Sequence, residues 1–189
     1  MKLNVTPDSG YMISKVMCGN EEIVPVNGIY SFVMPDEDVT VTAEFVYGER
    51  GLVVGGTAVN GVNCGDILGD GTASYDYDTN TLSLNNAVIE IAKYNDLPTA
   101  YGIRYNVEKD IPFKISLSGS NVIADSTTDD TNKKYGITLI STAPSYEITG
   151  GTLTISCSVP GTVSRWTAIQ EANGSQKTLI SIFYLMRRI

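Results

Sequence analysis

Apolar and polar residues alternate along several short stretches of this chain, which is the pattern of β-strands with one buried face. The run Val39-Thr40-Val41-Thr42-Ala43-Glu44-Phe45 alternates throughout. Asn27-Gly28 predicts a hairpin turn, and Pro35-Asp36-Glu37-Asp38 has the chemistry of a turn that ends a strand. Further strand-like runs lie at residues 2–6, 11–16 and 30–34. The first part of the chain therefore predicts a small antiparallel β-unit.

Beyond residue 51 the strand-like pattern repeats. Similar strings occur at residues 82–89, 115–123 and 146–155. Aligning Leu84, Leu117 and Ile148 gives spacings of 33 and 31 residues. Self-similarity at such a period is typical of repeat architectures, in which each repeat is one structural unit.

A second motif recurs between these strings with nearly the same period. It reads Tyr101-Gly102-Ile103, then Tyr135-Gly136-Ile137, then Thr167-Ala168-Ile169, with spacings of 34 and 32 residues. Two motifs whose spacings vary in parallel around the same period favour a right-handed parallel β-helix, or β-solenoid. In such a fold, coils of 31–34 residues share a continuous core. Gly102 and Gly136 are expected at tight bends of the coil wall. The alternative is a β-sandwich.

Composition supports an all-β fold with three segments. Only 18% of the residues are charged, and runs rich in Ala, Leu, Glu and Lys are missing, which argues against helices. We expect a truncated β-repeat at residues 1–46, a β-solenoid region at 51–172 and an atypical tail or cap at 173–189. The tail matches no repeat, and residues 176–189 carry three basic side chains and no acidic one.

Charge and hydropathy exclude several partners. The net charge of −8 repels phosphate backbones, so we expect no nucleic-acid binding. The apolar run 179–186 is too short to span a bilayer, so we expect no membrane insertion. The chain shows no signal peptide, and Met1-Lys2-Leu3-Asn4 leads directly into strand-like sequence. We therefore expect that it begins inside a longer protein.

Catalysis is not expected. The chain has no histidine, which removes Ser-His-Asp and Cys-His nucleophilic systems and His-ligated metals. Arg104 and Arg165, the arginines of the repeat region, lie in no recognisable motif. The three cysteines, Cys18, Cys64 and Cys157, are far apart and show no metal or redox spacing.

An acidic cluster around Gly69-Asp70-Gly71 is the candidate metal site. Calcium favours several carboxylate and carbonyl oxygens on a flexible loop, and Asp70, Asp76 and Asp78 are the candidate ligands, with Asp66 nearby. The spacing is not that of an EF-hand. The alternative interpretation is a solvated polar turn before the strand at Thr81.

Aromatic side chains are the candidate ligand-binding groups. Tyr101 and Tyr135 have the same parity as Ile103 and Ile137, so we expect both rings on the inward face, as core stacks. The alternative is an aromatic ladder on a face of the solenoid, on which sugar rings could stack. Trp166 breaks that parity relative to Ile169. We therefore take Trp166 as the best candidate for an exposed aromatic side chain that contacts a ligand.

Two strings of the first segment carry a family resemblance. Val-Thr-Pro-Asp-Ser-Gly-Tyr at 5–11 and Tyr-Ser-Phe-Val-Met-Pro-Asp-Glu-Asp-Val-Thr-Val-Thr-Ala-Glu-Phe at 30–45 resemble the bacterial surface repeat of the internalin B-repeat group. These repeats usually start with an earlier Gly-rich hairpin, so the resemblance implies a truncated repeat. The group acts mostly as spacers in surface proteins and brings no catalytic residues.

A second resemblance begins at residue 52. Leu-Val-Val-Gly-Gly-Thr-Ala-Val at 52–59 and the string at 66–87 resemble the start of repeat regions in large gut-bacterial surface proteins. Those regions are similar to carbohydrate-binding parallel β-helix proteins of clostridia. The resemblance implies a secreted or cell-surface bacterial module for adhesion or carbohydrate binding, with polysaccharide or host and cell-wall glycan as its partner. The alternative is a structural spacer without a ligand. The oligomeric state stays open.

Overall fold

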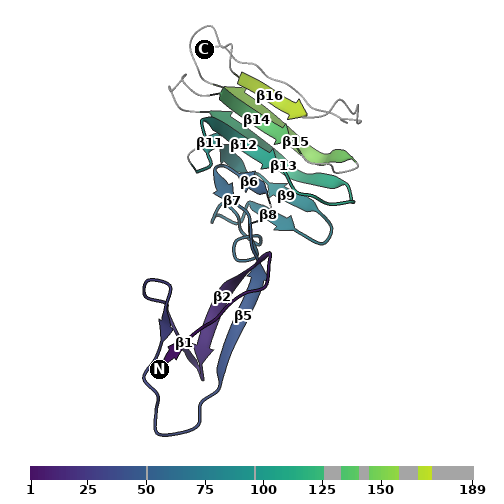
Figure 1. Ribbon diagram of the computed structural model, residues 1–189. Helices are drawn as coiled ribbons and strands as arrows, with labels where there is room; N and C mark the ends of the chain where they lie inside the picture. Colours follow the sequence, from purple (N-terminus) through teal and green to yellow (C-terminus); the bar gives the residue numbers. More distant parts are fainter. Residues whose placement is uncertain (50, 96, 126–132, 141–144, 158–165, 172–189) are drawn as a thin grey trace. The chain divides into compact units, whose positions relative to one another are not determined.

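The computed structural model describes residues 1–189 except 50, 96, 126–132, 141–144, 158–165 and 172–189 (Figure 1). The described residues form β-strands and connecting turns, with no helix among them, so the protein is all-β. No helix in this part of the chain is therefore long and apolar enough to cross a membrane. The chain divides into two compact units. Unit 1 comprises 1–49 and 60–62, and unit 2 comprises 50–59 and 63–189.

Unit 1 is built from antiparallel strands. Its three-stranded sheet has the order β3-β2-β5, and a separate two-stranded ribbon pairs β1 with β4. The strands are β1 (Lys2–Leu3), β2 (Tyr11–Cys18), β3 (Glu21–Glu22), β4 (Tyr30–Ser31) and β5 (Val41–Tyr47). The predicted strand at 30–34 is thus limited to its first two residues.

The predicted hairpin turn at Asn27-Gly28 is confirmed. Val26 and Ile29 pair with each other through backbone hydrogen bonds of 3.1 and 3.0 Å. Asn27 and Gly28 between them have φ angles of 51° and 76°. Positive φ at both central residues is the type I′ geometry that two-residue hairpin loops favour, and Asn-Gly is the pair that adopts it most readily.

Unit 2 contains two sheets that mix parallel and antiparallel pairs of strands (Figure 1). The first has the order β8-β9-β13, with β10 and β15 also paired to β13, and the second has the order β7-β6-β12-β14-β16, with β11 paired to β12. Their bounds are β6 (Leu52–Val54), β7 (Thr57–Ala58), β8 (Ala73–Asp76), β9 (Thr81–Asn85), β10 (Val88–Glu90), β11 (Ala92–Lys93), β12 (Thr99–Tyr105), β13 (Phe113–Asp125), β14 (Lys133–Leu139), β15 (Tyr146–Cys157) and β16 (Trp166–Glu171).

The strand register confirms the period of the Tyr-Gly-Ile motif. Tyr101 on β12 pairs with Tyr135 on β14, which in turn pairs with Thr167 on β16. In the other sheet Leu84 pairs with Leu117, as the spacing predicts. The alignment of Ile148 with Leu117 is wrong by two residues, because Ile148 pairs with Ile115. A two-residue offset leaves the same face inward, so the apolar pattern could not detect it.

Antiparallel hairpins begin both sheets. β8 pairs antiparallel with β9, and the β6–β7 hairpin pairs antiparallel with β12 through β6. The strands that follow along the chain, β13 and β15 in one sheet and β14 and β16 in the other, join parallel. Short edge strands such as β7 and β8 protect a sheet edge against further pairing.

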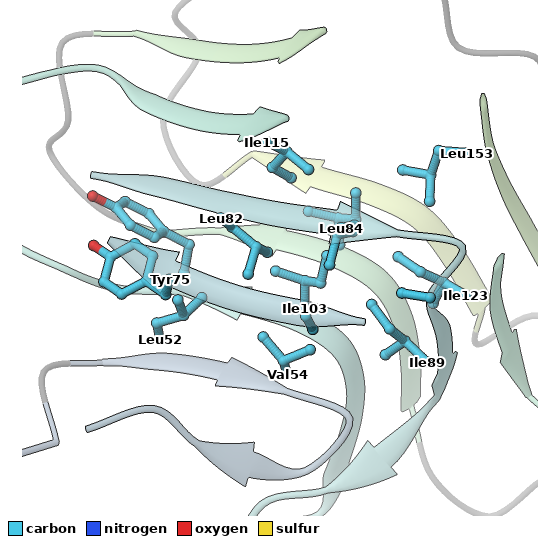
Figure 2. Close-up of a cluster of buried hydrophobic side chains, with 14 of the residues drawn as sticks. Leu52, Val54, Tyr75, Leu82, Leu84, Ile89, Ile103, Ile115, Ile123 and Leu153 are labelled. Carbon is cyan, nitrogen blue, oxygen red and sulfur yellow. The ribbon is translucent and has the colours of Figure 1, made fainter. Parts of the chain in front are cut away.

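The core of unit 2 lies between the two sheets (Figure 2). Rows of apolar side chains run across the parallel strands. Leu82, Ile115 and Ile148 form one such row, and their exposed fractions are 0%, 2% and 7%. Burying each such side chain contributes about 1.5–3 kcal/mol, so the rows supply most of the free energy that holds successive strands together.

A bend in the first sheet recurs at one place in successive strands. Asn86 and Gly119 occupy it with φ angles of 53° and 65°, a region that Gly and Asn tolerate best. Asn86 Oδ1 accepts a hydrogen bond of 3.0 Å from the Ser120 N–H. Asn121 Oδ1 accepts one of 2.9 Å from Ala87, and Asn121 Nδ2 donates to the Thr152 carbonyl at 3.2 Å. These two amides therefore link three successive strand layers.

Gly102 and Gly136, predicted at bends of the coil wall, lie within strands rather than in the turns between them. They lie side by side within β12 and β14. A Cβ atom at Gly102 would collide with Cγ2 of Ile123 in the core and with the Gly136 carbonyl oxygen. Glycine is required here by close packing, since Ile123 and the neighbouring backbone occupy the space of a side chain.

The variant Gly102→Ala should therefore lower the free energy of unfolding. Overpacking of a filled core costs about 1–3 kcal/mol. Gly65 is the matched control, because nothing lies within 4 Å of a Cβ placed there, and Gly65→Ala should change stability by less than about 0.5 kcal/mol. Urea denaturation followed by far-UV circular dichroism measures both. Equal stability of the two variants would contradict the packing argument.

A buried ion pair connects β13 to β14. Lys134 Nζ lies 2.7 Å from Asp125 Oδ2, and the two side chains are 5% and 0% exposed. Removing one member of such a pair leaves the other charge buried without it, which costs far more than the pair itself contributes.

Lys134→Met should consequently destabilise the protein by about 3–5 kcal/mol. The exposed pair of Lys114 and Glu147, 3.8 Å apart with side chains 47% and 46% exposed, is the control. Lys114→Met should cost less than about 1 kcal/mol. Denaturant titration of both variants makes the comparison, and a cost for Lys134→Met no larger than that of the control would show that the buried pair is dispensable.

Candidate functional site

The predicted acidic cluster folds as a series of tight turns at the start of unit 2. Asp66 Oδ1 accepts hydrogen bonds of 2.9 Å from the N–H groups of both Gly69 and Gly71. Asp70 Oδ1 accepts from the Thr72 hydroxyl at 2.6 Å and from the Thr72 N–H at 3.0 Å. Each carboxylate thus holds the backbone of its own turn, as Asx-turns do.

Asp76 ends β8, and Asp78 lies in the turn between β8 and β9. Asp76 Oδ1 accepts from the N–H groups of Asp78 at 2.8 Å and Thr79 at 3.2 Å. Asp76 and Asp78 are exposed, whereas Tyr75 is buried and Tyr77 half-buried. Asp and Tyr therefore alternate between the two faces of this segment.

The hydrogen bonds lower the pKa values of two of these carboxyl groups. The pKa of Asp70 lies below its usual value of 3.8, chiefly because the Thr72 hydroxyl donates to its charged form. The pKa of Asp76 is also lowered, first by the Thr79 N–H. A depressed folded-state pKa stabilises the turn fully above the usual value, and this stabilisation is lost as the pH falls through the folded-state pKa.

The Thr72→Val variant tests this assignment, because it removes the hydroxyl and keeps the side-chain shape. The pKa of Asp70 should rise toward 3.8, while the pKa of Asp76, whose donors lie in a separate turn, should not move. Carboxyl ¹³C shifts followed by NMR from pH 2 to pH 6 measure both. If Asp70 titrates unchanged in the variant, the hydroxyl is not the cause of the lowered pKa.

The structure does not assemble these residues into a metal centre. Among the described residues, no three His, Cys, Asp or Glu side chains are grouped so that they could hold a metal ion. Asp70, Asp76 and Asp78, the predicted calcium ligands, instead lie in two separate turns. The interpretation of the cluster as a polar turn agrees with the hydrogen bonds, and calcium binding stays a prediction without a formed site.

A buried polar network lies below the second of these turns. Asn80 is 0% exposed, and its Oδ1 accepts hydrogen bonds from the hydroxyl groups of Tyr75 at 2.6 Å and Tyr105 at 3.0 Å. Its Nδ2 donates to the Ile111 and Pro112 carbonyls, both at 3.2 Å. Burial raises the pKa of Tyr75, so this hydroxyl stays protonated and the network is structural.

Tyr101 and Tyr135 do not point into the core, which corrects the parity argument. Both rings are half-buried, and neither belongs to the core cluster, although Ala100 and Ile103 do. Ala100 and Ile103 are three residues apart, so strict alternation is interrupted between them. The interruption falls at Gly102, which lies against the core residue Ile123. Tyr101 is therefore turned to the outer face.

The two tyrosines form a stack on that outer face. Their ring centroids are 5.9 Å apart and the rings are inclined by 16°. The Arg104 guanidinium carbon lies 5.8 Å from the centroid of the Tyr101 ring, within the range of a cation–π contact. We call Tyr101, Tyr135 and Arg104 the outer aromatic patch.

Arg104 and Thr138 are the residues of this region that sequence reasoning missed. They pair with each other across β12 and β14. Arg104 Nε and Thr138 Oγ1 are buried and have no hydrogen-bond partner within the described part of the chain. Their register follows from the 34-residue spacing of the tyrosines. Strict alternation would put Tyr101 and Arg104 on opposite faces, so the sequence contained no signal that places Arg104 beside the Tyr101 ring.

Trp166, the predicted ligand-binding residue, begins β16. Its backbone pairs with that of Lys134 on β14, while its side chain is outside the described residues. Residues 173–189, the predicted tail or cap, are also outside them.

Comparison with known proteins gave no relative to set beside this geometry. No protein-family model matches the chain, and the searches of curated proteins and of solved structures returned no match.

Proposed function

We propose that unit 2 is a short right-handed parallel β-helix of three coils. Two sheets receive strands alternately along the chain, in the order β9, β12, β13, β14, β15 and β16. Strands within a sheet pair in parallel at offsets such as Tyr101 with Tyr135 and Phe113 with Tyr146. A β-sandwich is built from antiparallel strands, so the parallel pairs favour the solenoid over this alternative.

The chain is proposed to be a non-catalytic carbohydrate-binding or adhesion module of a secreted or cell-surface bacterial protein. The observation that carries this proposal is the outward position of the outer aromatic patch. Aromatic rings on an accessible face bind the apolar faces of sugar rings, and the guanidinium of Arg104 can donate hydrogen bonds to sugar hydroxyl groups. Aromatic rings at regular intervals along a solenoid also match the repeating units of a polysaccharide better than they match a single small ligand.

A structural spacer without a ligand is the second candidate. The support for it is the internal cross-linking of the layers by Asn86 and Asn121, which stiffens the stack whatever its outer face contacts. A spacer needs no conserved chemistry on its surface, and the two candidates therefore differ in what substitution of the outer aromatic patch does.

A glycan-array screen of the full chain, run with calcium and with a chelator, tests the first candidate. We expect binding to polysaccharide, and the double variant Tyr101→Ala/Tyr135→Ala should weaken it by at least about tenfold. Tyr30→Ala is the matched control, since Tyr30 is half-buried like Tyr101 and lies on β4 in unit 1. Affinity for the polysaccharide found is then measured by isothermal titration.

The outcomes separate the two candidates. Thermal unfolding must first show that the double variant is folded, and Tyr101→Phe provides a variant that keeps the stack. If the folded wild-type protein binds no glycan on the array in either condition, the structural spacer is the remaining candidate. Binding that survives in the double variant would place the glycan elsewhere. Loss of binding in chelator alone would revive the predicted calcium site at Asp70, Asp76 and Asp78.

A further inference from the structure

The sheet of unit 1 has one apolar face. In β5, Val41, Ala43, Phe45 and Tyr47 have the same parity and therefore point to one side. They pair with Cys18, Val16, Ile13 and Tyr11 of β2, respectively. A bulge between Ile13 and Lys15 shifts the parity of β2, so that all four of its residues also lie on this side. We call these eight residues the β2–β5 face.

The β2–β5 face is exposed at its two ends, whereas Val16 between them is 1% exposed. Tyr11, Phe45 and Val41 are 41%, 44% and 37% exposed. Among the large hydrophobic residues of unit 1, only Val16 and Ile23 are buried. In unit 2, by contrast, no residue of the core is more than 9% exposed. Large apolar side chains that share one exposed face mark an interaction surface.

Unit 1 is acidic, and one of its carboxylates lies on this face. Unit 1 carries eight acidic residues within 1–49, all of them exposed, against two basic ones, Lys2 and Lys15, a net charge of −6. Glu21 on β3 pairs with Cys18, which also pairs with Val41, so a carboxylate lies in the same row as the apolar face. An occupant of this face should be apolar and carry positive charge.

The end of the chain has that chemistry. Residues 178–189 read Thr-Leu-Ile-Ser-Ile-Phe-Tyr-Leu-Met-Arg-Arg-Ile, preceded by Lys177, and contain no acidic residue. Bulky and β-branched residues of this kind favour an extended conformation on a sheet. Arg187 and Arg188 then supply charge that complements Glu21 and the acidic surface of unit 1.

We propose that the β2–β5 face binds residues 178–189 of a second copy of the chain, which joins copies head to tail. The segment follows β16, which ends the sheet order β7-β6-β12-β14-β16 on one side. The β6–β7 hairpin, which follows residues 1–49 along the chain, ends this order on the other side. We therefore take the segment from a second copy. Each copy then has one acceptor face and one donor segment. Such a heterologous contact extends into open chains rather than closing as a dimer.

Size-exclusion chromatography with light scattering on the full chain tests the proposal. The mass should rise with concentration beyond that of a dimer, and should fall as salt screens the charges. Deletion of residues 178–189 and the substitution Phe45→Ser should each give a monomer. Val88→Ser is the matched control, because Val88 is 66% exposed on β10 in unit 2 and its loss should leave assembly unchanged.

A charge variant tests the same contact in case the deletion variant does not fold. Arg187→Glu/Arg188→Glu should also give a monomer, with circular dichroism like that of the wild type. A synthetic peptide of residues 176–189 should bind the deletion variant, and at least tenfold more weakly when Phe45→Ser is added. A monomeric wild type, assembly that persists without residues 178–189, or equal peptide affinity with and without Phe45→Ser would each overturn the proposal.

Discussion

The in-register stacking of apolar side chains from successive strands is the constraint on which unit 2 depends. Neither sheet can bury its apolar face alone, and the two sheets share one core. The row of Leu82, Ile115 and Ile148 and the row of Ile89, Ile123 and Ile155 show how the layers share one core. A layer that slipped by one residue would turn its apolar side chains outward, so the rows also determine the register.

Polar groups inside this core add specificity that apolar contacts alone lack. Asn80, Asn121 and the pair of Asp125 and Lys134 are buried, and each needs particular partners from another layer or loop. Because an unpaired polar group is costly inside a protein, a register that separated these partners would be strongly disfavoured. The apolar rows thus supply cohesion, and the buried polar groups distinguish the native register from its alternatives.

The same packing produces the candidate site. Gly102 lies against Ile123, and β12 changes the side to which its residues point at that position, so Tyr101 faces outward and stacks on Tyr135. The proposed binding patch is therefore a consequence of how tightly the core is filled beneath it. The sheet of unit 1, by contrast, buries few residues, and the two ends of its apolar face stay exposed.

The sequence alone determined the features that follow from local pattern. It placed strands at 11–16 and 39–45 in unit 1, the turn at Asn27-Gly28 and the spacing that pairs Tyr101 with Tyr135, because alternation and repetition are written along the chain. Only the tertiary structure decided which way Tyr101 points, since that depends on contact between Gly102 and Ile123. It likewise decided that Asp66, Asp70 and Asp76 bind their own turns, because the position of nearby donors, and not residue type, determines what a carboxylate contacts.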